Sequence, residues 1–331
     1  MLRSRAFKIL LSTGAAAALV WLLVRHVDLA EVGRRIAAAS PPWVWASTAL
    51  ALLTYLMRAW RWTWILKPVG KVGLLPSFYA TAVGFAGNFL PARAGEVIRP
   101  AVLARETGLP FTTLLASILF ERLLDAASVL FFLGVALLDP PWKKTIGAAG
   151  PPVAMGVLPV AALLGVVALC YLAMFRRGVL QGMLDLVLHA VPARFRAPAR
   201  AGFSAFLDGL ALVKGFDPRQ WAVVLGGSLA MWFVIDLQIA CVVRAFGIDL
   251  PLSAAYVLTF AAVLGLAIPT PAGIGGYHAA VTAALVGFGV HEDTALGVAT
   301  VAHAVSFGPI TLIALAMLLG RSFRKTAPEQ G

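Results

Sequence analysis

Charged residues are scarce in this chain. They make up 13% of its 331 residues, whereas hydrophobic residues make up 60%. A soluble domain usually has about 25% charged residues. This balance excludes a soluble globular enzyme and a disordered chain, and the mean hydropathy of +0.89 agrees with that exclusion. The composition therefore predicts a polytopic membrane protein, all-α in class, because only helices and closed barrels span membranes.

Cysteine and the common cofactor motifs are also missing or rare. The two cysteines, Cys170 and Cys241, lie in apolar stretches, and neither belongs to a CxxC pair. A disulfide scaffold is thereby excluded. The chain has no HxxxH or glutamate-rich spacing, so we assign no metal. It has no GxxxxGK[ST] motif, so we expect no ATP use and assign no cofactor.

The charges that are present are mostly positive. Lysine and arginine number 27 against 15 acidic residues, which gives a net charge of +12. No basic run is interleaved with exposed aromatics, so we do not expect a nucleic-acid partner. Basic loops that face an anionic cytoplasmic leaflet explain the excess better.

Apolar segments near spanning length recur along the chain. A bilayer core of about 30 Å needs about 20 apolar residues in a helix. The N-terminal segment fits either a signal peptide or a signal anchor, and we favour the anchor because no clear small-residue cleavage site follows it. The predicted spans are 7–25, 43–64, 113–138, 153–175, 219–245, 252–268, 274–290 and 294–319.

A ninth apolar stretch, 74–90, is short and rich in small residues. If it enters and leaves on the cytoplasmic side, most lysines and arginines fall on that side, as the positive-inside rule requires. That count places Arg58 and Arg61 with the cytoplasmic loop cations. We therefore expect 74–90 to be re-entrant and both termini to be cytoplasmic.

The segment 179–215 between two spans is amphipathic. Its apolar residues recur at helical spacing and several arginines follow them. We interpret it as a pair of cytoplasmic helices lying on anionic lipid. A helix that docks a partner protein is the alternative.

A few ionisable residues lie inside predicted spans, where each is costly. Glu121, Arg122 and Asp125 cluster in 113–138, and two carboxylates with one arginine predict a net negative site. Either Arg122 pairs with Asp125 and a neighbouring arginine to hold helices together, or the cluster is functional. Asp236 lies within 219–245, His278 near the start of 274–290 and His303 within 294–319. Membrane histidines of this kind more often bond between helices than bind ligands.

The stretch 87–99 breaks one helix and begins another. Pro91 ends the first, and Gly95 allows close backbone approach before the next. A helix N-terminus attracts anions, and arginine side chains bind phosphate and carboxylate in a forked geometry. The candidate headgroup-binding residues are Asn88, Arg93, Glu96 and Arg99, with Glu96 expected to orient Arg99 by an ion pair. Alternatively, these charges only set the topology.

A second break lies at 268–278, in the other half of the chain. Its Pro271, Gly273 and Gly275 separate two short apolar segments whose hairpin starts and ends outside. The first hairpin starts and ends inside. Short interrupted segments in opposite orientations predict inverted repeats that meet at a central site.

Three blocks of residues carry a resemblance to a known family. They are Asn88-x-x-Pro91-x-Arg93-x-Gly95-Glu96-x-x-Arg99, Glu121-Arg122-x-x-Asp125 and Pro269-x-Pro271-x-Gly273-x-Gly275. In these blocks the chain resembles the lysylphosphatidylglycerol synthase transmembrane-region family, also called the flippase-like domain family. The resemblance implies a multi-pass protein of the bacterial inner membrane that moves a lipid between leaflets.

The chain departs from that family in three ways. Only residues 320–331 follow the last predicted span, so we expect no aminoacyl-transferase domain like that of the founding members. His278 stands where the family usually has glutamate, and His303 stands near its usual arginine. If the family residues pair, a contact between the two histidines is expected to replace that ion pair.

The sequence thus predicts one integral membrane domain over 1–331, with a membrane-embedded core at 7–325. Its expected function is lipid translocation, with a membrane lipid as substrate and without a soluble catalytic domain. A membrane-embedded transferase is the first alternative. An accessory scaffold docked through 179–215 in a glycolipid, polyprenyl-lipid or hopanoid pathway is the second, with a lipid-synthesis enzyme or glycosyltransferase as its partner. The expected cavity and gating residues are Glu121, Arg122, Asp125, Asp236, Pro271, Gly273, Gly275, His278 and His303.

Overall fold

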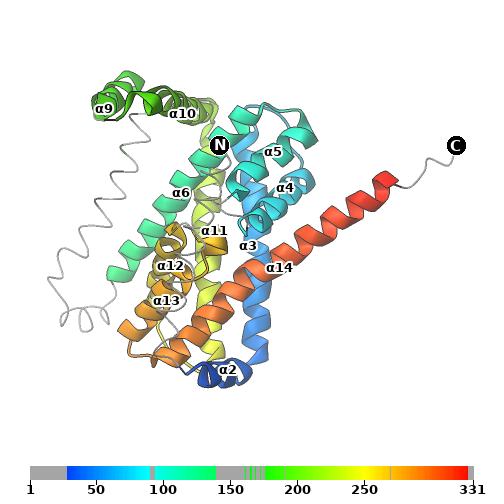
Figure 1. Cartoon of the computed structure of the whole chain (residues 1–331), viewed down its shortest axis with the longest axis vertical. Coiled ribbons are helices and arrows are strands. Elements are labelled where there is room, and N and C mark those ends of the chain that lie inside the picture. Colours follow the sequence, from blue (N-terminus) through cyan, green and yellow to red (C-terminus); the bar gives the residue numbers. More distant parts are fainter. Residues whose placement is uncertain are drawn as a thin grey trace.

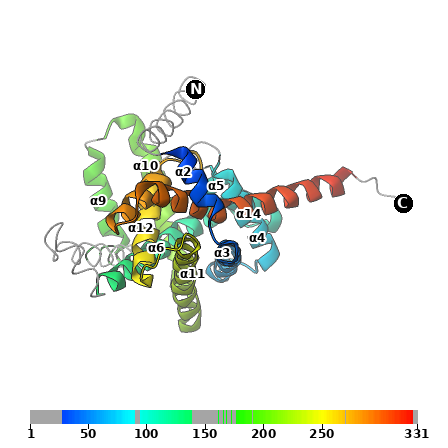
Figure 2. The same ribbon diagram turned by 90° about the horizontal axis from the view of Figure 1, so that it is seen from below.

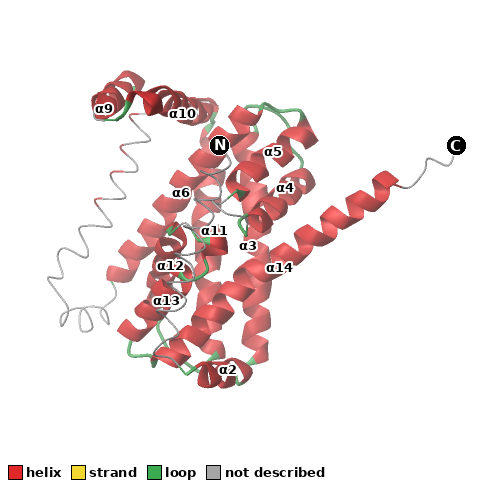
Figure 3. Ribbon diagram, viewed as in Figure 1, coloured by secondary structure: helices red, strands yellow, loops and turns green. Residues whose placement is uncertain are grey.

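A computed structural model describes residues 28–89, 94–138, 176–189, 191–268 and 270–326, together with four isolated positions between 161 and 172. Every regular element in these residues is a helix (Figure 3), which confirms the all-α fold. The predicted span 7–25 lies outside the described residues, and so does 153–175 apart from those four positions.

Two long antiparallel helices form the centre of the structure. They are α3 (Pro41–Leu66) and α11 (Pro218–Ala245), seen side by side in Figures 1 and 2. The amide of Ser40, before α3, donates to the carbonyl of Ala245 at 2.8 Å. At the other end, the side-chain amide of Gln220 donates to the carbonyl of Trp64 at 2.7 Å. The start of each helix is thus fixed to the end of the other.

The sequence sets where these two helices begin. Pro41 and Pro218 occupy first-turn positions, where the missing N–H costs nothing. The carboxylate of Asp217 also caps α11, accepting from the amide of Gln220 at 2.6 Å. These local signals explain why the predicted spans 43–64 and 219–245 lie within two residues of the observed bounds.

After each central helix the chain forms a short hairpin. The first consists of α4 (Leu74–Gly87) and α5 (Gly95–Thr107). The second consists of α12 (Leu252–Ala267) and α13 (Gly276–Gly287), with the turn η3 (Pro271–Gly273) in its break. At about 1.5 Å per residue, these helices are shorter than a 30 Å hydrocarbon core. Residues 252–290, for which the sequence left full spans and a re-entrant hairpin both open, form one hairpin of two short helices with a break between them.

Glycine pairs bring the two arms of each hairpin into backbone contact. A Cβ atom added to Gly95 would lie 1.9 Å from the carbonyl oxygen of Gly84. A Cβ atom added to Gly265 would lie 2.4 Å from the carbonyl oxygen of Gly276. Such close approach needs small residues, as in other membrane helix crossings. Both hairpins therefore close on a glycine–glycine contact next to the break.

The two halves of the chain repeat the same order of helices, and the first residues of matching helices are 177 to 181 residues apart. An offset of 181 relates the glycine pairs (84 to 265 and 95 to 276) and also the first residues of α6 (Phe111–Leu137) and α14 (Glu292–Thr326). Helix α14 packs on α4 of the first hairpin, and α6 packs on α12 of the second. Because α3 and α11 are antiparallel, the hairpins enter from opposite ends. The predicted inverted repeat is confirmed.

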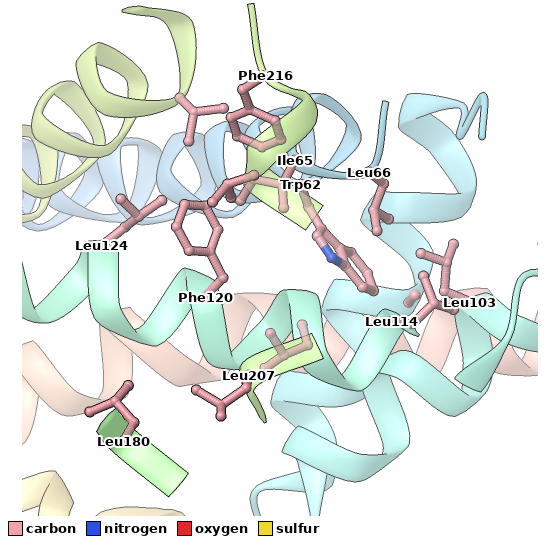
Figure 4. Close-up of a cluster of buried hydrophobic side chains, with 14 residues drawn as sticks. Trp62, Ile65, Leu66, Leu103, Leu114, Phe120, Leu124, Leu180, Leu207 and Phe216 are labelled. Carbon is pink, nitrogen blue, oxygen red and sulfur yellow. The ribbon is translucent and has the colours of Figure 1, made fainter. Parts of the chain in front are cut away.

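The remaining described helices lie at the edges of this core. Helix α2 (Leu29–Ala37) meets α3 at an angle of 87°. Helices α9 (Arg177–His189) and α10 (Ala193–Ala211), followed by the turn η2 (Leu212–Gly215), lie across one end of the bundle in Figure 1. Leu180 and Leu207 join a buried cluster with Trp62 and Phe120, shown in Figure 4. Whether α9 and α10 lie on lipid stays a prediction.

Two described helices are long and apolar enough to cross a membrane, α11 and the part of α14 from Glu292 to Arg321. A third span results if α2 and α3 are taken as one bent segment. Helix α6 is also 27 residues long but carries three charged side chains near its middle. Together with the broken hairpins, these helices make a polytopic membrane protein. The count of eight spans stays a prediction.

The glycine contacts generate a stability prediction. Gly276→Ala is expected to lower the free energy of unfolding by about 1–3 kcal/mol, because the new Cβ would press on backbone that cannot move aside. Gly287→Ala on the same helix is the matched control, since its Cβ would meet no atom within 4 Å. Unfolding in detergent, followed by temperature or denaturant, measures both. Equal stability of the two variants would contradict the close contact.

Candidate functional site

A cluster of six charged side chains connects the first hairpin to the central helices. Its members come from α3, α5 and α6, and all lie in the interior of the bundle. Five are at least nine-tenths buried, and the sixth, Arg122, has 38% of its side chain exposed. We call this group the charge cluster, and it consists of Arg58, Arg61, Arg99, Glu121, Arg122 and Asp125.

Asp125 accepts bonds from three helices. Its carboxylate lies 2.9 Å from Nη1 of Arg58 and 2.8 Å from Nη2 of Arg61. It also lies 3.2 Å from Nη2 of Arg122 on its own helix. The indole N–H of Trp232, on α11, donates to it at 3.0 Å. One carboxylate thus links α3, α6 and α11.

Glu121 connects the charge cluster to the first hairpin. One carboxylate oxygen, Oε1, lies 2.9 Å from Nη1 of Arg58 and 2.8 Å from Nη1 of Arg99. Arg61 and Arg122 approach the same oxygen at 3.4 and 3.2 Å. The other oxygen, Oε2, has no hydrogen-bond partner among the described residues. The guanidinium of Arg99 also stacks on Trp62, 4.0 Å from the ring centre.

The structure corrects three sequence predictions about these charges. Four arginines face two carboxylates, so the charge cluster is net positive rather than net negative. Arg58 and Arg61 are buried inside α3 and are not loop cations. Arg99 pairs with Glu121, whereas the sequence predicted that it would pair with Glu96. The three-residue spacing of Arg58 and Arg61 within an apolar segment was the signal that could have placed them on one buried face.

A cavity of about 360 Å³ lies beside the charge cluster, within the size range of small-molecule sites. Residues of both hairpins and both central helices line it, so it lies where the two repeats meet. Apolar side chains such as Phe85, Trp232 and Phe307 form much of its wall. The polar residues in the lining are Thr54, Tyr55, Arg58, Asn88, Glu96, Arg122, Asp125, Gln238, Thr259, Thr270, Tyr277 and Ser306.

The two breaks touch each other at this cavity. The amide of Ala272 donates to the carbonyl of Asn88 at 2.9 Å. Ala272 has a φ of +51°, an uncommon conformation for a residue with a side chain, and Gly273 and Gly275 follow at +75° and +88°. Pro271 opens this turn. The glycines are therefore needed for the backbone path that brings the second break to the first.

The two membrane histidines support the second break. Their ring centres lie 4.9 Å apart, which confirms the predicted contact between His278 and His303. One ring nitrogen of His303, Nε2, lies 2.9 Å from the carbonyl oxygen of Ala272. Neither histidine lines the cavity. Their position indicates that they hold the turn in place and do not directly contact a molecule bound in the cavity.

Asp236 lies close to the cavity without lining it. It is buried, and its Oδ1 accepts a hydrogen bond from the hydroxyl of Thr259 at 2.5 Å. Its other oxygen has no hydrogen-bond partner among the described residues. Thr259 itself lines the cavity. Within the described part of the chain, no three histidine, cysteine or acidic residues gather where they could hold a metal ion.

The structure places two of the four predicted headgroup-binding residues in the cavity lining. Asn88 and Glu96 line the cavity, at the end of α4 and in the first turn of α5. Arg99 lies behind them, bonded to Glu121. Arg93 lies outside the described residues, so its role stays a prediction.

Comparison with known proteins gives the family of the chain. Residues 6–314 match the model of the lysylphosphatidylglycerol synthase TM region. The chain belongs to this family. A curated relative, named glycosyltransferase AglD, comes from Haloferax volcanii and is 28% identical over 321 residues. The match covers 86% of this chain but 50% of the relative, so the chain spans about half of that protein's length.

The charge cluster generates a second stability prediction. Glu121→Gln keeps the shape of the side chain but removes the carboxylate that four arginines share. It is expected to cost about 3–5 kcal/mol, because buried positive charge is then left uncompensated.

The matched control is Asp185→Asn, which breaks an exposed pair with Arg200 on α10 and is expected to cost less than about 1 kcal/mol. Unfolding in detergent distinguishes the two variants. A small effect of Glu121→Gln would show that the charge cluster does not hold the helices together.

Proposed function

We propose that this protein moves a lipid between the leaflets of a membrane, and that the headgroup crosses through the cavity between the two hairpins. One observation carries this proposal, the position of a partly polar cavity at the meeting point of two hairpins that enter from opposite ends. Inverted hairpins of this kind surround the substrate sites of many transporters. The lipid tails would stay in the bilayer.

The lining of the cavity provides what a headgroup needs on this path. A polar group that leaves water for hydrocarbon loses several kcal/mol of hydrogen bonding. Asn88, Thr270 and Ser306 offer neutral hydrogen-bonding groups, and Arg122 offers a charged one. These groups would replace the water shell of the headgroup at mid-membrane depth. Asp236, through Thr259, and the two histidines, through Ala272, would keep the lining in place.

The family assignment supports a role in a lipid pathway, because the family is named after a lipid-modifying synthase. We place the protein in the inner membrane of a bacterium with both termini in the cytoplasm, as the charge distribution favours. The helices α9 and α10 would then lie at the cytoplasmic surface, where a lipid-synthesis enzyme could dock.

A second candidate function rests on the relative that is named a glycosyltransferase. In this alternative the chain is a membrane-embedded transferase for a lipid-linked sugar, or an accessory to one. Such an enzyme needs a general base. Glu121 and Asp125 are engaged by arginines, so the acids left for that role are Glu96, which lines the cavity, and Asp236, which lies beside it.

Translocation is tested by blocking the cavity. Ala126 lines it on α6, and Ala126→Trp is expected to stop movement of fluorescent lipids between leaflets in proteoliposomes, because the indole fills the path. Val135→Trp, on the exposed face of the same helix, is the matched control and should keep the activity. Unfolding measurements show whether both variants fold. Unchanged lipid movement in a folded Ala126→Trp protein would contradict the proposal that the headgroup passes through this cavity.

The transferase alternative makes a different prediction. An enzyme should turn over a short-chain lipid-linked sugar in detergent, with no bilayer present, and should lose that activity in Asp236→Asn. We expect no turnover in detergent by the wild type or by Asp236→Asn. Product formation by the wild type that disappears in Asp236→Asn would favour the transferase over the translocator.

A further inference from the structure

We propose that Asp236 binds a proton, and that this proton couples the movement of the headgroup to a proton gradient across the membrane. This inference rests on the proposed function and adds its source of energy. It starts from a difference between the buried acids of the described chain, which are Glu121, Asp125 and Asp236.

Asp236 has no positive partner, unlike the other two acids. Glu121 and Asp125 share the arginines of the charge cluster. No described arginine or lysine lies close enough to Asp236 to act on its charge. The residue is 1% exposed and lies well inside α11, a helix long and apolar enough to span a membrane. An isolated carboxylate is so costly in such a place that the group takes up a proton instead.

The hydrogen bonds of Asp236 leave one oxygen free for this proton. Its Oδ1 accepts from the hydroxyl of Thr259 at 2.5 Å, a bond that both the acid and the carboxylate can keep. Its Oδ2 has no hydrogen-bond partner among the described residues. An unsatisfied buried group costs more when it is charged. The proton therefore belongs on Oδ2.

Thr259 connects this acid to the cavity. Thr259 lines the cavity, whereas Asp236 does not. A hydroxyl both donates and accepts hydrogen bonds, so it can pass a proton between the acid and water that enters the cavity. Acids inside membrane spans form proton relays in pumps and transporters. Asp236 is thus one side chain away from the path proposed for the headgroup.

The groups around Asp236 provide no other positive charge. Helices α3, α6, α12 and α14 pack against α11. On α12, the phenol of Tyr256 lies within electrostatic range of Asp236. The arginines on α3 and α6 are engaged by the carboxylates of the charge cluster. The titratable and charged groups of α3, α6 and α14 that line the cavity or contact its lining are Tyr55, Arg58, Arg61, Glu121, Arg122, Asp125 and His303.

The contacts of Asp236 fit a proton better than a metal cation. Cations such as Ca²⁺ and Mg²⁺ take about six to eight oxygen ligands. The hydrogen bond between Asp236 and Thr259 brings together one carboxylate and one hydroxyl. A proton needs only the free oxygen. A sodium gradient is therefore the control for a pH gradient.

The coupling step moves one proton in each cycle. Inverted repeats open a central site to the two sides of the membrane in turn. A hydronium ion on one side gives its proton to the carboxylate of Asp236, which becomes the neutral acid while the cavity is closed. When the cavity opens to the other side, the acid gives the proton to water and becomes a carboxylate again. One positive charge therefore crosses the membrane per cycle.

The first experiment detects the proton on the full chain in detergent. Infrared spectra at neutral pH should contain the C=O band of a protonated carboxyl group, which a carboxylate lacks. This band should disappear in Asp236→Asn and shift in Asp236→Glu. It should stay unchanged in Asp185→Asn, the matched control, whose side chain forms an exposed ion pair with Arg200. Identical carboxyl bands in Asp236→Asn and the wild type would overturn the proton site.

The second experiment measures coupling in proteoliposomes. The probes are fluorescent phosphatidylcholine and a fluorescent glucosyl diacylglycerol, whose headgroups do not titrate near neutral pH. A pH difference of one unit should shift the ratio of lipid between the leaflets by up to about tenfold, because one proton moves per lipid. Asp236→Asn should lose this shift, whereas Asp236→Glu should keep it. Thr259→Val, which lacks the hydroxyl, should reduce the shift, and Thr259→Ser should retain it.

The outcomes separate this inference from the proposed function. If Asp236 carries a proton but the wild type moves no lipid, the proton site stands and translocation fails. If lipid moves without any response to pH, or responds equally in Asp236→Asn and the wild type, translocation stands and the coupling fails. A response to a sodium gradient in place of a pH gradient would assign a metal cation and overturn the proposal.

Discussion

The described structure depends on the ion pairs that Glu121 and Asp125 make inside the bundle. These two carboxylates hold arginines from α3 and α5, and Asp125 also accepts from Trp232 on α11. Among the described residues, these are the ion pairs that connect the first hairpin to the central helices. The hydrophobic effect contributes little to the association of helices in lipid. Ion pairs and close packing must therefore hold the helices together. The cavity exists because this framework fixes its walls.

Close packing provides the second part of that framework. The glycine pairs bring the two arms of each hairpin into backbone contact next to the break. The break between the arms then reaches the centre of the bundle, and the amide of Ala272 meets the carbonyl of Asn88. Irregular backbone within a membrane protein is tolerated where it contacts protein or lines a cavity. Asn88 and Ala272 contact each other and also line the cavity.

Much of the fold follows from the sequence alone. Long apolar segments with proline or aspartate at their starts predict α3, α6 and α11, and the two breaks predict the inverted hairpins. The charge cluster was predicted only in part. Membership of Glu121, Arg122 and Asp125 follows from their place in an apolar span. The partners from α3 and α5 do not, because Arg58, Arg61 and Arg99 read equally well as loop cations near span ends. Pairing across helices is set by packing, which no single segment encodes.

The repeat of the helices has a consequence for the electric field in the centre of the molecule. The members of the charge cluster on α5 and α6 have counterparts 181 residues later on α13 and α14, and none of these counterparts is an acid, arginine or lysine. They are Ala280, Ala302, His303 and Ser306. The backbone is therefore duplicated while the charge is not. One wall of the cavity is ionic and the opposite wall is neutral, so a molecule inside experiences a gradient of potential that the near-symmetric shape would never suggest.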